Sequence, residues 1–454
     1  MVAAATLLDD LAAVATDELR RWQVTGIALG LRHGGETHAL GLGSASLETG
    51  FPVLPQTLFQ IGSISKIVTT TLVMQLVDEG RLALDAPVVS VLPDFHLADE
   101  AATRSLTLRH LLTHTGGFFG DRFEDQGPDA DALARAVAGF GTLRQYAPPG
   151  EVWAYCNLGF QLAGRMAEIV LGQPFETAVR ERMFEPLGMM RSFYFAEDAI
   201  TYPVATGHNL LPDGTNEAAH VWARARCRAP QGGLTSCVAD LLRFAAPHLG
   251  DGGNLLSASS VRLMQTPQVE AAQTPHWGLG WSLDRVDSGG AAWVGHGGVT
   301  NGFQAQLSLL PQHGFAFAAL SNGNQGGAVI RAVESWLLER CLGLRRSEPP
   351  EVALSAAELA PLVGVYDGPL ARYTLSVADG GLRIEEDRLN PFTGIRAPVA
   401  PAHARPIGPR RFRIADGAQQ GAVFDFIGGG GGDGGDTARP RWLRMNNRLA
   451  DRIA

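Results

Sequence analysis

The single lysine of this 454-residue chain is its most constraining feature, because it lies inside an apolar stretch, residues 63–79. The chain has 37 basic side chains, and all of them except Lys66 are arginines. A helix that is apolar on every side is buried, so this one carries its amine into the interior. Arginine keeps its charge there, whereas a desolvated ammonium can lose its proton. Lys66 is therefore a candidate base.

Ser63 lies three residues before Lys66 and is the candidate nucleophile. Residues at i and i+3 share one face of a helix, so the hydroxyl and the amine can come within hydrogen-bond reach. The start of a helix also offers partial positive charge and free N–H groups, which favour an alkoxide. The alternative is a lysine that survives there by chance, and its place beside a helix-opening serine argues against that.

Composition and charge narrow the class of protein. The net charge of −9 and the absence of basic runs longer than pairs argue against nucleic acid and membrane surfaces as partners. Residues 1–21 predict an amphipathic helix rather than a secretory leader, and no apolar stretch is long enough to span a bilayer. The four cysteines show no disulfide or CxxC spacing. We therefore expect a cytoplasmic protein.

The order of strands and helices predicts an α+β fold. Strands near both ends of the first 346 residues, with helices between them, indicate an antiparallel sheet flanked by N- and C-terminal helices, with an inserted helical domain. The expected catalytic domain is 1–346, with an α/β part at 1–65 and 270–346 and a helical part at about 66–269. The expected strands are 26–32, 36–44, 277–283, 291–294, 302–310 and 315–321, and the expected helices are 63–79, 106–113, 158–171, 236–246 and 328–342.

Residues 347–454 predict a separate, small all-β domain. A proline-containing linker at 347–350 precedes short alternating stretches at 373–377, 382–384, 412–414 and 422–427, a pattern typical of a barrel or sandwich. Residues 428–435 are mostly glycine, and we expect them to form a mobile loop.

Two further motifs carry chemistry. In Tyr155-Cys156-Asn157, the tyrosine can relay a proton and the asparagine can hold a substrate amide or the lysine amine; a buried tyrosine beside a helix cap is the alternative. The second motif is a glycine-rich segment on a strand, where an N–H could complete an oxyanion hole with that of Ser63. Phosphate binding is the competing interpretation, disfavoured because no helix start follows these glycines. The second motif comprises Gly295, His296, Gly297, Gly298 and Val299.

These three motifs, in this order, resemble the serine β-lactamase and penicillin-binding-protein superfamily. The resemblance is strongest to the class C β-lactamase-related branch, with its family VIII esterases, D-aminopeptidases and amide hydrolases. It covers residues 5–342 and includes FQIGS at 59–63, LTLRHLLTHTGG at 106–117, PLGM at 186–189, GGLTS at 232–236 and WGLGW at 277–281. The tail resembles the lipocalin-like barrel of some members, through LVGVY at 362–366.

The resemblance implies roles for the motif residues. Ser63 would be acylated, Lys66 and Tyr155 would move protons, and Asn157 would orient the substrate. The backbone N–H groups of Ser63 and Val299 would hold the oxyanion. No metal or organic cofactor is implied.

One departure from the family shapes the expected substrate. Where β-lactamases carry Lys-Thr-Gly, this chain has His296-Gly297-Gly298, and so lacks the cation and hydroxyl that would hold a β-lactam carboxylate. We therefore expect a serine hydrolase of esters, amides, D-aminoacyl compounds or short peptides, with weak or no β-lactamase activity. An acyltransferase on the same site and a non-catalytic scaffold are the alternatives, and a homo-oligomer is left open.

Several other residues are expected to have structural or solvent-exposed roles rather than catalytic ones. His110 and His114 have the spacing of helical zinc ligands, but no third ligand accompanies them. Arg224, Arg226 and Arg228 alternate as on the outer face of a strand, so solvated surface is expected, although an arginine there could meet an anionic substrate. Cys156 is expected to be a packing residue. Specificity should depend on the loops at 120–131 and 209–231.

Overall fold

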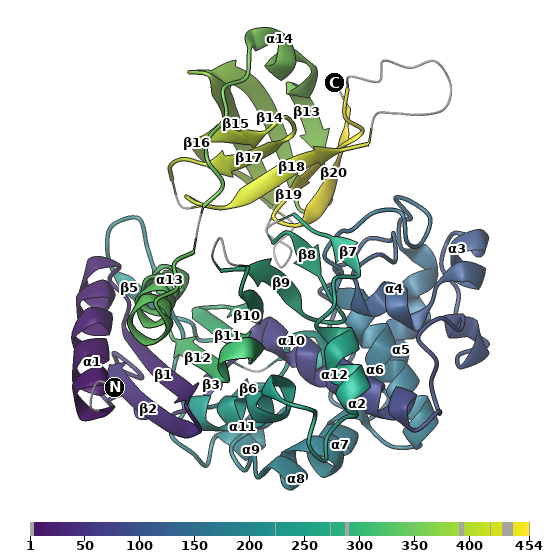
Figure 1. Cartoon of the computed structure of the whole chain (residues 1–454). Helices are drawn as coiled ribbons and strands as arrows, with labels where there is room; N and C mark the ends of the chain where they lie inside the picture. The colour runs from purple at the N-terminus through teal and green to yellow at the C-terminus, as the bar shows by residue number, and fades with distance from the viewer. Residues whose placement is uncertain are drawn as a thin grey trace. The chain divides into compact units, whose positions relative to one another are not determined.

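A computed structural model of the chain describes residues 4–222, 224–272, 274–286, 290–346, 348–389, 395–417, 419–428 and 439–453. The chain forms two compact units (Figure 1). The first comprises Met1–Val152, Cys156–Val269 and Trp277–Ser347, and the second comprises Trp153–Tyr155, Glu270–His276 and Glu348–Ala454. The predicted mobile loop at 428–435 lies outside the described residues, apart from Gly428.

An antiparallel sheet forms the centre of the first unit. Within the described residues its strand order is β2-β1-β12-β11-β10-β9-β8-β7, so strands from both ends of this unit pair directly. Residue Ile27 of β1 faces Ser321 of β12, which joins segments almost 300 positions apart. The strands are β1 (Gly26–His33), β2 (Glu36–Gly43), β7 (Val269–Glu270), β8 (His276–Trp277), β9 (Ser282–Arg285), β10 (Ala292–Thr300), β11 (Phe303–Leu310) and β12 (Phe315–Ser321).

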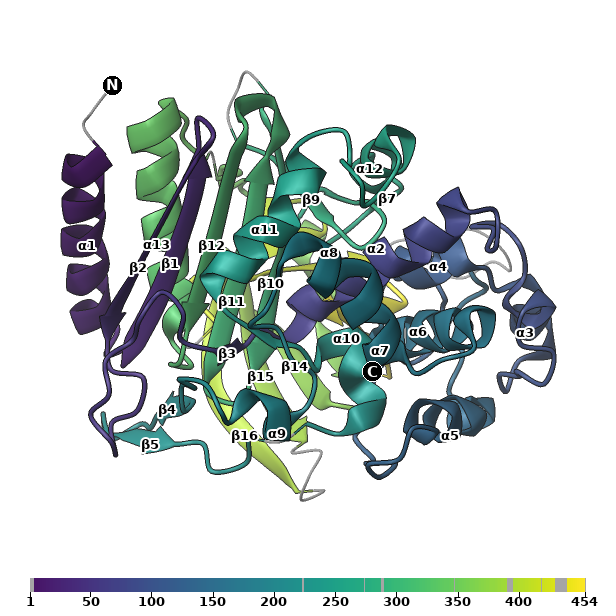
Figure 2. The ribbon, with the colours of Figure 1, turned by 90° about the horizontal axis from the view of Figure 1, so that it is seen from below.

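Helices cover both faces of this sheet. Helices α1 (Ala4–Arg21) and α13 (Gly326–Leu337) pack together on one face, as Figure 2 shows. Helix α11 (Val238–Leu249) contacts β1, β11 and β12 on the other face, and the remaining helices extend from there. They are α2 (Ser65–Asp78), α3 (Glu100–Ser105), α4 (Leu108–Leu112), α5 (Ala132–Ala138), α6 (Asn157–Leu171), α7 (Phe175–Val179), α8 (Glu185–Leu187), α9 (Ala196–Ala199), α10 (Ala229–Gly232) and α12 (Ala258–Met264).

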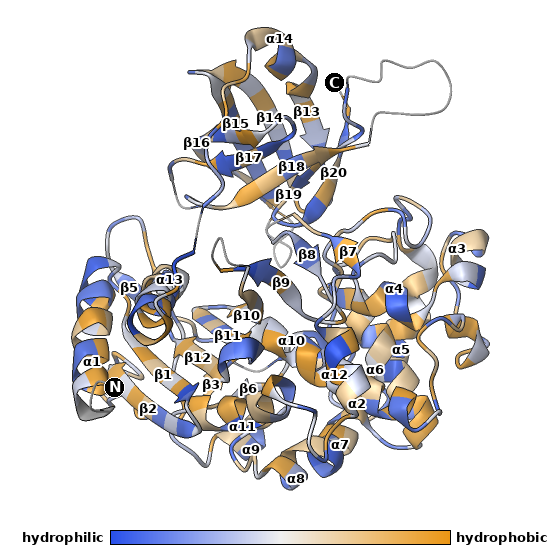
Figure 3. Ribbon diagram, viewed as in Figure 1, coloured by the Kyte–Doolittle hydropathy of each residue, from blue (hydrophilic) through white to orange (hydrophobic). Residues whose placement is uncertain are grey.

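Apolar periodicity explains which elements are inside. Helix α1 has an apolar and a polar side (Figure 3), and its apolar side packs with α13 against the sheet. Strand β1 is buried from Gly26 to Leu31, and β12 is buried along its whole length. Helix α2 is buried on every side from its first residue to Leu76, as its sequence predicts. A larger apolar core surrounds α2 and reaches the opposite face of the sheet.

The second unit contains a closed barrel, and its small helix α14 (Ala356–Leu359) precedes the first strand. Alternate residues of the strands fill the interior with aromatic side chains, including Tyr366, Phe412, Phe424 and Phe426. In the described part of the tail the strands are β13 (Gly364–Asp367), β14 (Ala371–Ala378), β15 (Gly381–Leu389), β16 (Arg396–Gly408), β17 (Arg411–Ile414), β18 (Val423–Ile427), β19 (Trp442–Met445) and β20 (Arg448–Arg452).

The predicted fold class is confirmed: an α+β unit with an inserted helical region, and an eight-stranded antiparallel barrel. The strand predicted at 277–283 is interrupted between β8 and β9. Gly280 adopts a positive φ of 73°, and its backbone lies against Thr70 of α2, which breaks the extended run. Across the described ranges, we find no helix with the length and apolarity to cross a bilayer.

Candidate active site

The structure brings the serine and the lysine of the first motif together. Lys66 Nζ lies 3.0 Å from Ser63 Oγ and donates to the carbonyl oxygen of Gln231 at 2.6 Å. The Lys66 side chain is wholly buried, and its ammonium lies 5.6 Å from the centre of the Phe160 ring. An amine that is sheltered from water and next to a hydroxyl has the geometry of a general base.

Ser63 lies in a 3₁₀ turn, Gly62–Ile64, rather than in the first turn of the α-helix, which begins two residues later at Ser65. Ser63 in the turn and Lys66 in the first turn of the α-helix are three residues apart, and their side chains meet across this junction. Gly62 has a positive φ of 51°, a conformation that favours glycine. The Ser65 hydroxyl donates to the Gly62 carbonyl at 2.7 Å and locks the turn.

The backbone of β10 runs against this turn. A Cβ atom added at Gly298 would lie 1.8 Å from the carbonyl oxygen of Ile61 and 3.1 Å from the amide nitrogen of Ser63. A Cβ added at Gly62 would lie 2.8 Å from the amide nitrogen of Val299. The glycines at 62 and 298 therefore permit two backbone segments to approach more closely than side chains would allow. The N–H groups of residues 63 and 299 belong to these adjoining segments.

His296 lies in β10 and is buried. Its Nδ1 is 2.6 Å from the carbonyl oxygen of Gly297, and the Trp277 ring meets its ring edge-on at 5.4 Å between centroids. Burial, and secondarily the charge of Lys66, lower the pKa of His296 to about 3. The side chain is thus neutral at pH 7 and adds no second cation beside the lysine. Gly297, next to it, is exposed.

Asn157 opens α6, and its side-chain amide donates to Asp121 Oδ1 at 2.6 Å. The preceding Cys156 caps this helix, because its Sγ accepts from the Gly159 N–H at 3.3 Å. The N–H of Cys156 donates to His114 Nδ1 at 2.9 Å. Cys156 and His114 therefore hold the motif in place, which agrees with the packing role predicted for the cysteine.

Tyr155 belongs to the second unit. Its N–H donates to the carbonyl oxygen of Asn447 at 2.9 Å, and the guanidinium of Arg448 lies 4.8 Å from its ring centre. The turn at Asn446 and Asn447 that makes this contact has two consecutive positive φ angles. The tyrosine of the second motif is thus fixed by the barrel.

Sequence reasoning missed two partners of the motif residues. The carbonyl oxygen of Gln231 and the carboxylate of Asp121 contact Lys66 and Asn157 from positions 165 and 36 residues away. Both lie in the loops expected to set specificity, but residue type alone gives no sign of a backbone carbonyl's target. Gly232-Gly233 after Gln231 was the nearest available indication of close packing.

The interpretation of Arg224, Arg226 and Arg228 as one solvated strand face is wrong. Residues Arg226–Arg228 form a 3₁₀ turn, and Arg226 is only 19% exposed in its ion pair with Glu176. His110 completes a capping box with Thr107, a structural role. Over the residues described, no group of three potential metal-ligating side chains occurs.

A sheet between helical layers, with a serine and a buried lysine at the start of the central helix, defines the class: the serine β-lactamase and penicillin-binding-protein superfamily. Comparison with known families gives the particular assignment. The sequence profile of the family described as Beta-lactamase matches residues 11–338, and the chain belongs to this family.

Individual relatives extend the comparison. The chain is 37% identical over 358 residues to "Penicillin-binding protein 4" of Amycolatopsis lactamdurans, which covers 76% of this chain and 93% of that protein. It is 30% identical over 380 residues to "Esterase EstB" of Burkholderia gladioli, covering 75% and 89%.

Among solved structures, the chain is similar to SurE, with 28% identity, coverage of 98% and 99%, and a TM-score of 0.76. A structure of SurE with D-Leu is similar at 26% identity, with the same coverage and a TM-score of 0.74. Together these findings support a serine hydrolase kind of function.

Proposed function

We propose that the chain is a serine hydrolase that cleaves ester or amide bonds through an acyl-enzyme on Ser63. The observation that carries this proposal is the 3.0 Å approach of the only lysine to the Ser63 hydroxyl, with that lysine fully buried. A surface lysine near a serine would stay protonated. Burial favours the neutral amine, which has a lone pair to accept the serine proton. We propose residues 1–346 as the catalytic domain.

In the first step, neutral Lys66 takes the proton of Ser63 while Oγ attacks the substrate carbonyl. One N–H of the amine continues to donate to the Gln231 carbonyl oxygen, so the lone pair stays directed at the serine. The proton then passes to the leaving oxygen or nitrogen, with Tyr155 as the proposed relay. The support for Tyr155 is its place in the motif and its firm attachment through Asn447.

The tetrahedral oxyanion is held by the N–H groups of Ser63 and Val299, supported by the close approach of their backbone segments. Asn157, oriented by Asp121, donates to the substrate. A water molecule then attacks the acyl-enzyme, with Lys66 again as base, and Ser63 is regenerated.

Esters, amides and D-aminoacyl compounds are the proposed substrates. EstB is named an esterase, and the related SurE structure holds D-Leu. A β-lactam carboxylate would find neutral His296 where it needs a cation, so we propose weak or no β-lactamase activity. A reducing, cytoplasmic location is also proposed, supported by the spacing of the four cysteines, which matches neither CxxC nor a disulfide framework.

Acyl transfer to an amine is the second candidate, and the D-Leu of the related structure favours it. A free amino acid carries both a carboxylate, the product of hydrolysis, and an amine that could accept an acyl group. Adding D-Leu or hydroxylamine to an ester assay separates the two. Transfer predicts an amide or hydroxamate product, whereas hydrolysis predicts only the free acid.

A fluorophosphonate probe and a panel of p-nitrophenyl esters, D- and L-aminoacyl anilides and nitrocefin test the proposal. We expect turnover of esters or anilides above that of nitrocefin, and one probe adduct on the peptide that contains Ser63. Ser63→Ala should abolish both. Absence of adduct and turnover in folded protein would favour the non-catalytic scaffold.

A further inference from the structure

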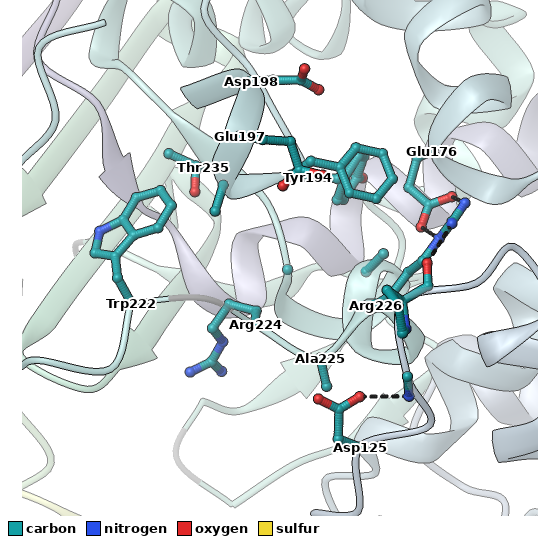
Figure 4. A pocket seen from close by; sticks show the side chains of 16 residues that line it. Asp125, Glu176, Tyr194, Glu197, Asp198, Trp222, Arg224, Ala225, Arg226 and Thr235 are labelled. Atoms are coloured by element: carbon teal, nitrogen blue, oxygen red, sulfur yellow. Dashed lines mark hydrogen bonds and ion pairs between the residues drawn. The ribbon is translucent and has the colours of Figure 1, made fainter. Parts of the chain in front are cut away.

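A cavity of about 420 Å³ lies between the two loops expected to govern specificity. Figure 4 shows it with Trp222 and Arg224 at one side and the Glu176–Arg226 pair at the other. Asp125 comes from the loop at 120–131, and the arginines come from the loop at 209–231. All of these residues belong to the first unit.

Arg224 is the unusual member of this lining. It makes no hydrogen bond or ion pair to any described residue, and its Nε is buried without an acceptor. Burial, and secondarily the neighbouring charge of Arg228, lower the pKa of Arg224 to about 10. The contrast with Arg226 is clear, because Arg226 donates to both carboxylate oxygens of Glu176 at 3.0 and 3.3 Å.

Two neighbouring side chains, Arg228 and Tyr194, also have buried donors without an acceptor among the described residues. Arg228 donates to the carbonyl oxygen of Phe123 and stacks on its ring, but its Nε also lacks an acceptor in the described structure. The hydroxyl of Tyr194, which lines the cavity, is buried with no partner among the described groups. Burial raises its pKa well above the ordinary value, so it remains a donor.

The acidic residues of the lining do not cancel this positive charge. Glu176 is engaged with Arg226, and Asp125, Glu197 and Asp198 are exposed to solvent. Water and salt screen exposed carboxylates, whereas a partly buried cation without a partner retains part of its desolvation cost. The interior of the cavity thus presents donors and positive charge, a setting that suits a carboxylate.

The wall of this cavity is also a wall of the candidate active site. Ala229, Gly233 and Thr235 line the cavity, while the same segment contacts the catalytic turn. The Gln231 carbonyl accepts from Lys66, and the Leu234 carbonyl accepts from the Ile61 N–H at 3.1 Å. The loop at 120–131, which supplies Asp125, also contains Asp121, the partner of Asn157. The cavity and the candidate active site therefore share the segment 229–235 as a common wall.

We propose that this cavity binds a carboxylate of the substrate and that Arg224 sets a preference for acidic substrates. The proposal rests on the hydrolase function proposed above. The carboxylate accepts from the Arg224 guanidinium and lies within the field of Arg228. Neither side chain takes part in bond breaking, so the binding affects which ester reaches Ser63.

Two matched pairs of esters test this directly in the full-length protein. In the acyl pair, mono-p-nitrophenyl glutarate is compared with neutral p-nitrophenyl pentanoate. In the leaving-group pair, 4-carboxyphenyl acetate is compared with phenyl acetate. The proposal predicts that the wild type prefers the acidic member of at least one pair, mainly through a lower KM. The pair that shows this preference tells whether the cavity binds the acyl group or the leaving group of the substrate.

Arg224→Gln should lower that preference, measured as the ratio of kcat/KM values, by about 10- to 100-fold. Arg224→Lys should retain part of it. Glutarate should inhibit the wild type competitively and inhibit Arg224→Gln far more weakly. Arg20→Gln removes a charge from the exposed surface of α1 and should leave the ratio unchanged.

Wild type that turns over acidic and neutral esters equally in both pairs would overturn the proposal, as would an unchanged ratio in folded Arg224→Gln. Turnover of the neutral esters in the same assay keeps the hydrolase function separate from this result. If no ester is hydrolysed and Ser63 takes no probe, the proposed function itself fails.

Discussion

Two basic side chains of the first unit, Lys66 and Arg224, differ in how the chain accommodates them. Lys66 contacts Ser63 and the Gln231 carbonyl, and the aromatic face of Phe160 covers it. Arg224 has no hydrogen-bond or charge partner within the described residues and is repelled by Arg228. The amine of Lys66 has partners within the chain, whereas the guanidinium of Arg224 has none among the described residues.

The difference indicates two kinds of task. An amine that must gain and lose a proton needs fixed partners that keep its lone pair directed at the hydroxyl, because it exchanges that proton with another side chain of the protein. A guanidinium stays charged and can do no proton transfer, so an unsatisfied one is suited to meeting a ligand. The predictions below test each side of this contrast, beginning with the largest effect.

Removing the proton acceptor should have the largest effect. Lys66→Met and Lys66→Arg should lower kcat for ester hydrolysis by about 100- to 10,000-fold, since neither side chain can accept the Ser63 proton. Steady-state kinetics with p-nitrophenyl esters measures this, and circular dichroism verifies the fold. Wild-type-like turnover by either variant would remove the lysine's assigned role.

The glycines of β10 offer a matched pair. Gly298→Ala places Cβ 1.8 Å from the Ile61 carbonyl oxygen and should displace β10 from the serine turn, with loss of activity and about 3 kcal/mol of stability. Gly297→Ala meets the flexible end of Gln306 at 3.3 Å and the Ala305 carbonyl oxygen at an ordinary contact distance of 3.6 Å, and should cost much less. Activity and urea denaturation distinguish them, and equal effects would argue against the close approach.

Two buried histidines predict how stability depends on pH. Burial lowers the pKa of His296 and of His248 to about 3, below the unfolded value of about 6.5. The unfolded chain therefore binds protons that the folded chain does not, so stability is full above pH 6.5 and falls as pH drops toward 3.

At pH 5 each histidine should reduce the free energy of unfolding by about 2 kcal/mol relative to neutral pH. His248→Gln and His296→Gln should each flatten this dependence when urea denaturation is compared between pH 7 and pH 5. His248 lies in α11, away from the motif residues, so its variant separates stability from catalysis. An unchanged slope in both variants would show that these rings are protonated in the folded state.

The smallest expected effect concerns Arg224 in the absence of ligand. Arg224→Met removes a partly buried charge that has no partner among the described residues, so the free energy of unfolding should rise by about 1 kcal/mol. Arg226→Met leaves Glu176 without its partner and should instead destabilise the protein. Thermal unfolding compares the two variants, and a loss of stability in Arg224→Met would mean that its charge is already compensated.

Much of this fold and site could be predicted because the determining patterns are local. An apolar helix with one lysine fixes burial, and alternation fixes the strands of the barrel. The 3₁₀ turn at Ser63 and the break at Gly280 depend on contacts with distant backbone, which periodicity does not encode. The environment of Arg224 was harder to predict than either of these features, because it depends on how two loops fold together.

Stopped-flow acylation of the enzyme by an activated ester measures the central step most directly. Under single-turnover conditions, wild type should release p-nitrophenol in a burst, and mass spectrometry of the quenched protein should place the acyl group on Ser63. Lys66→Met should form the same adduct at least 100-fold more slowly. Equal acylation rates in both proteins, or an acyl group on another residue, would contradict the account.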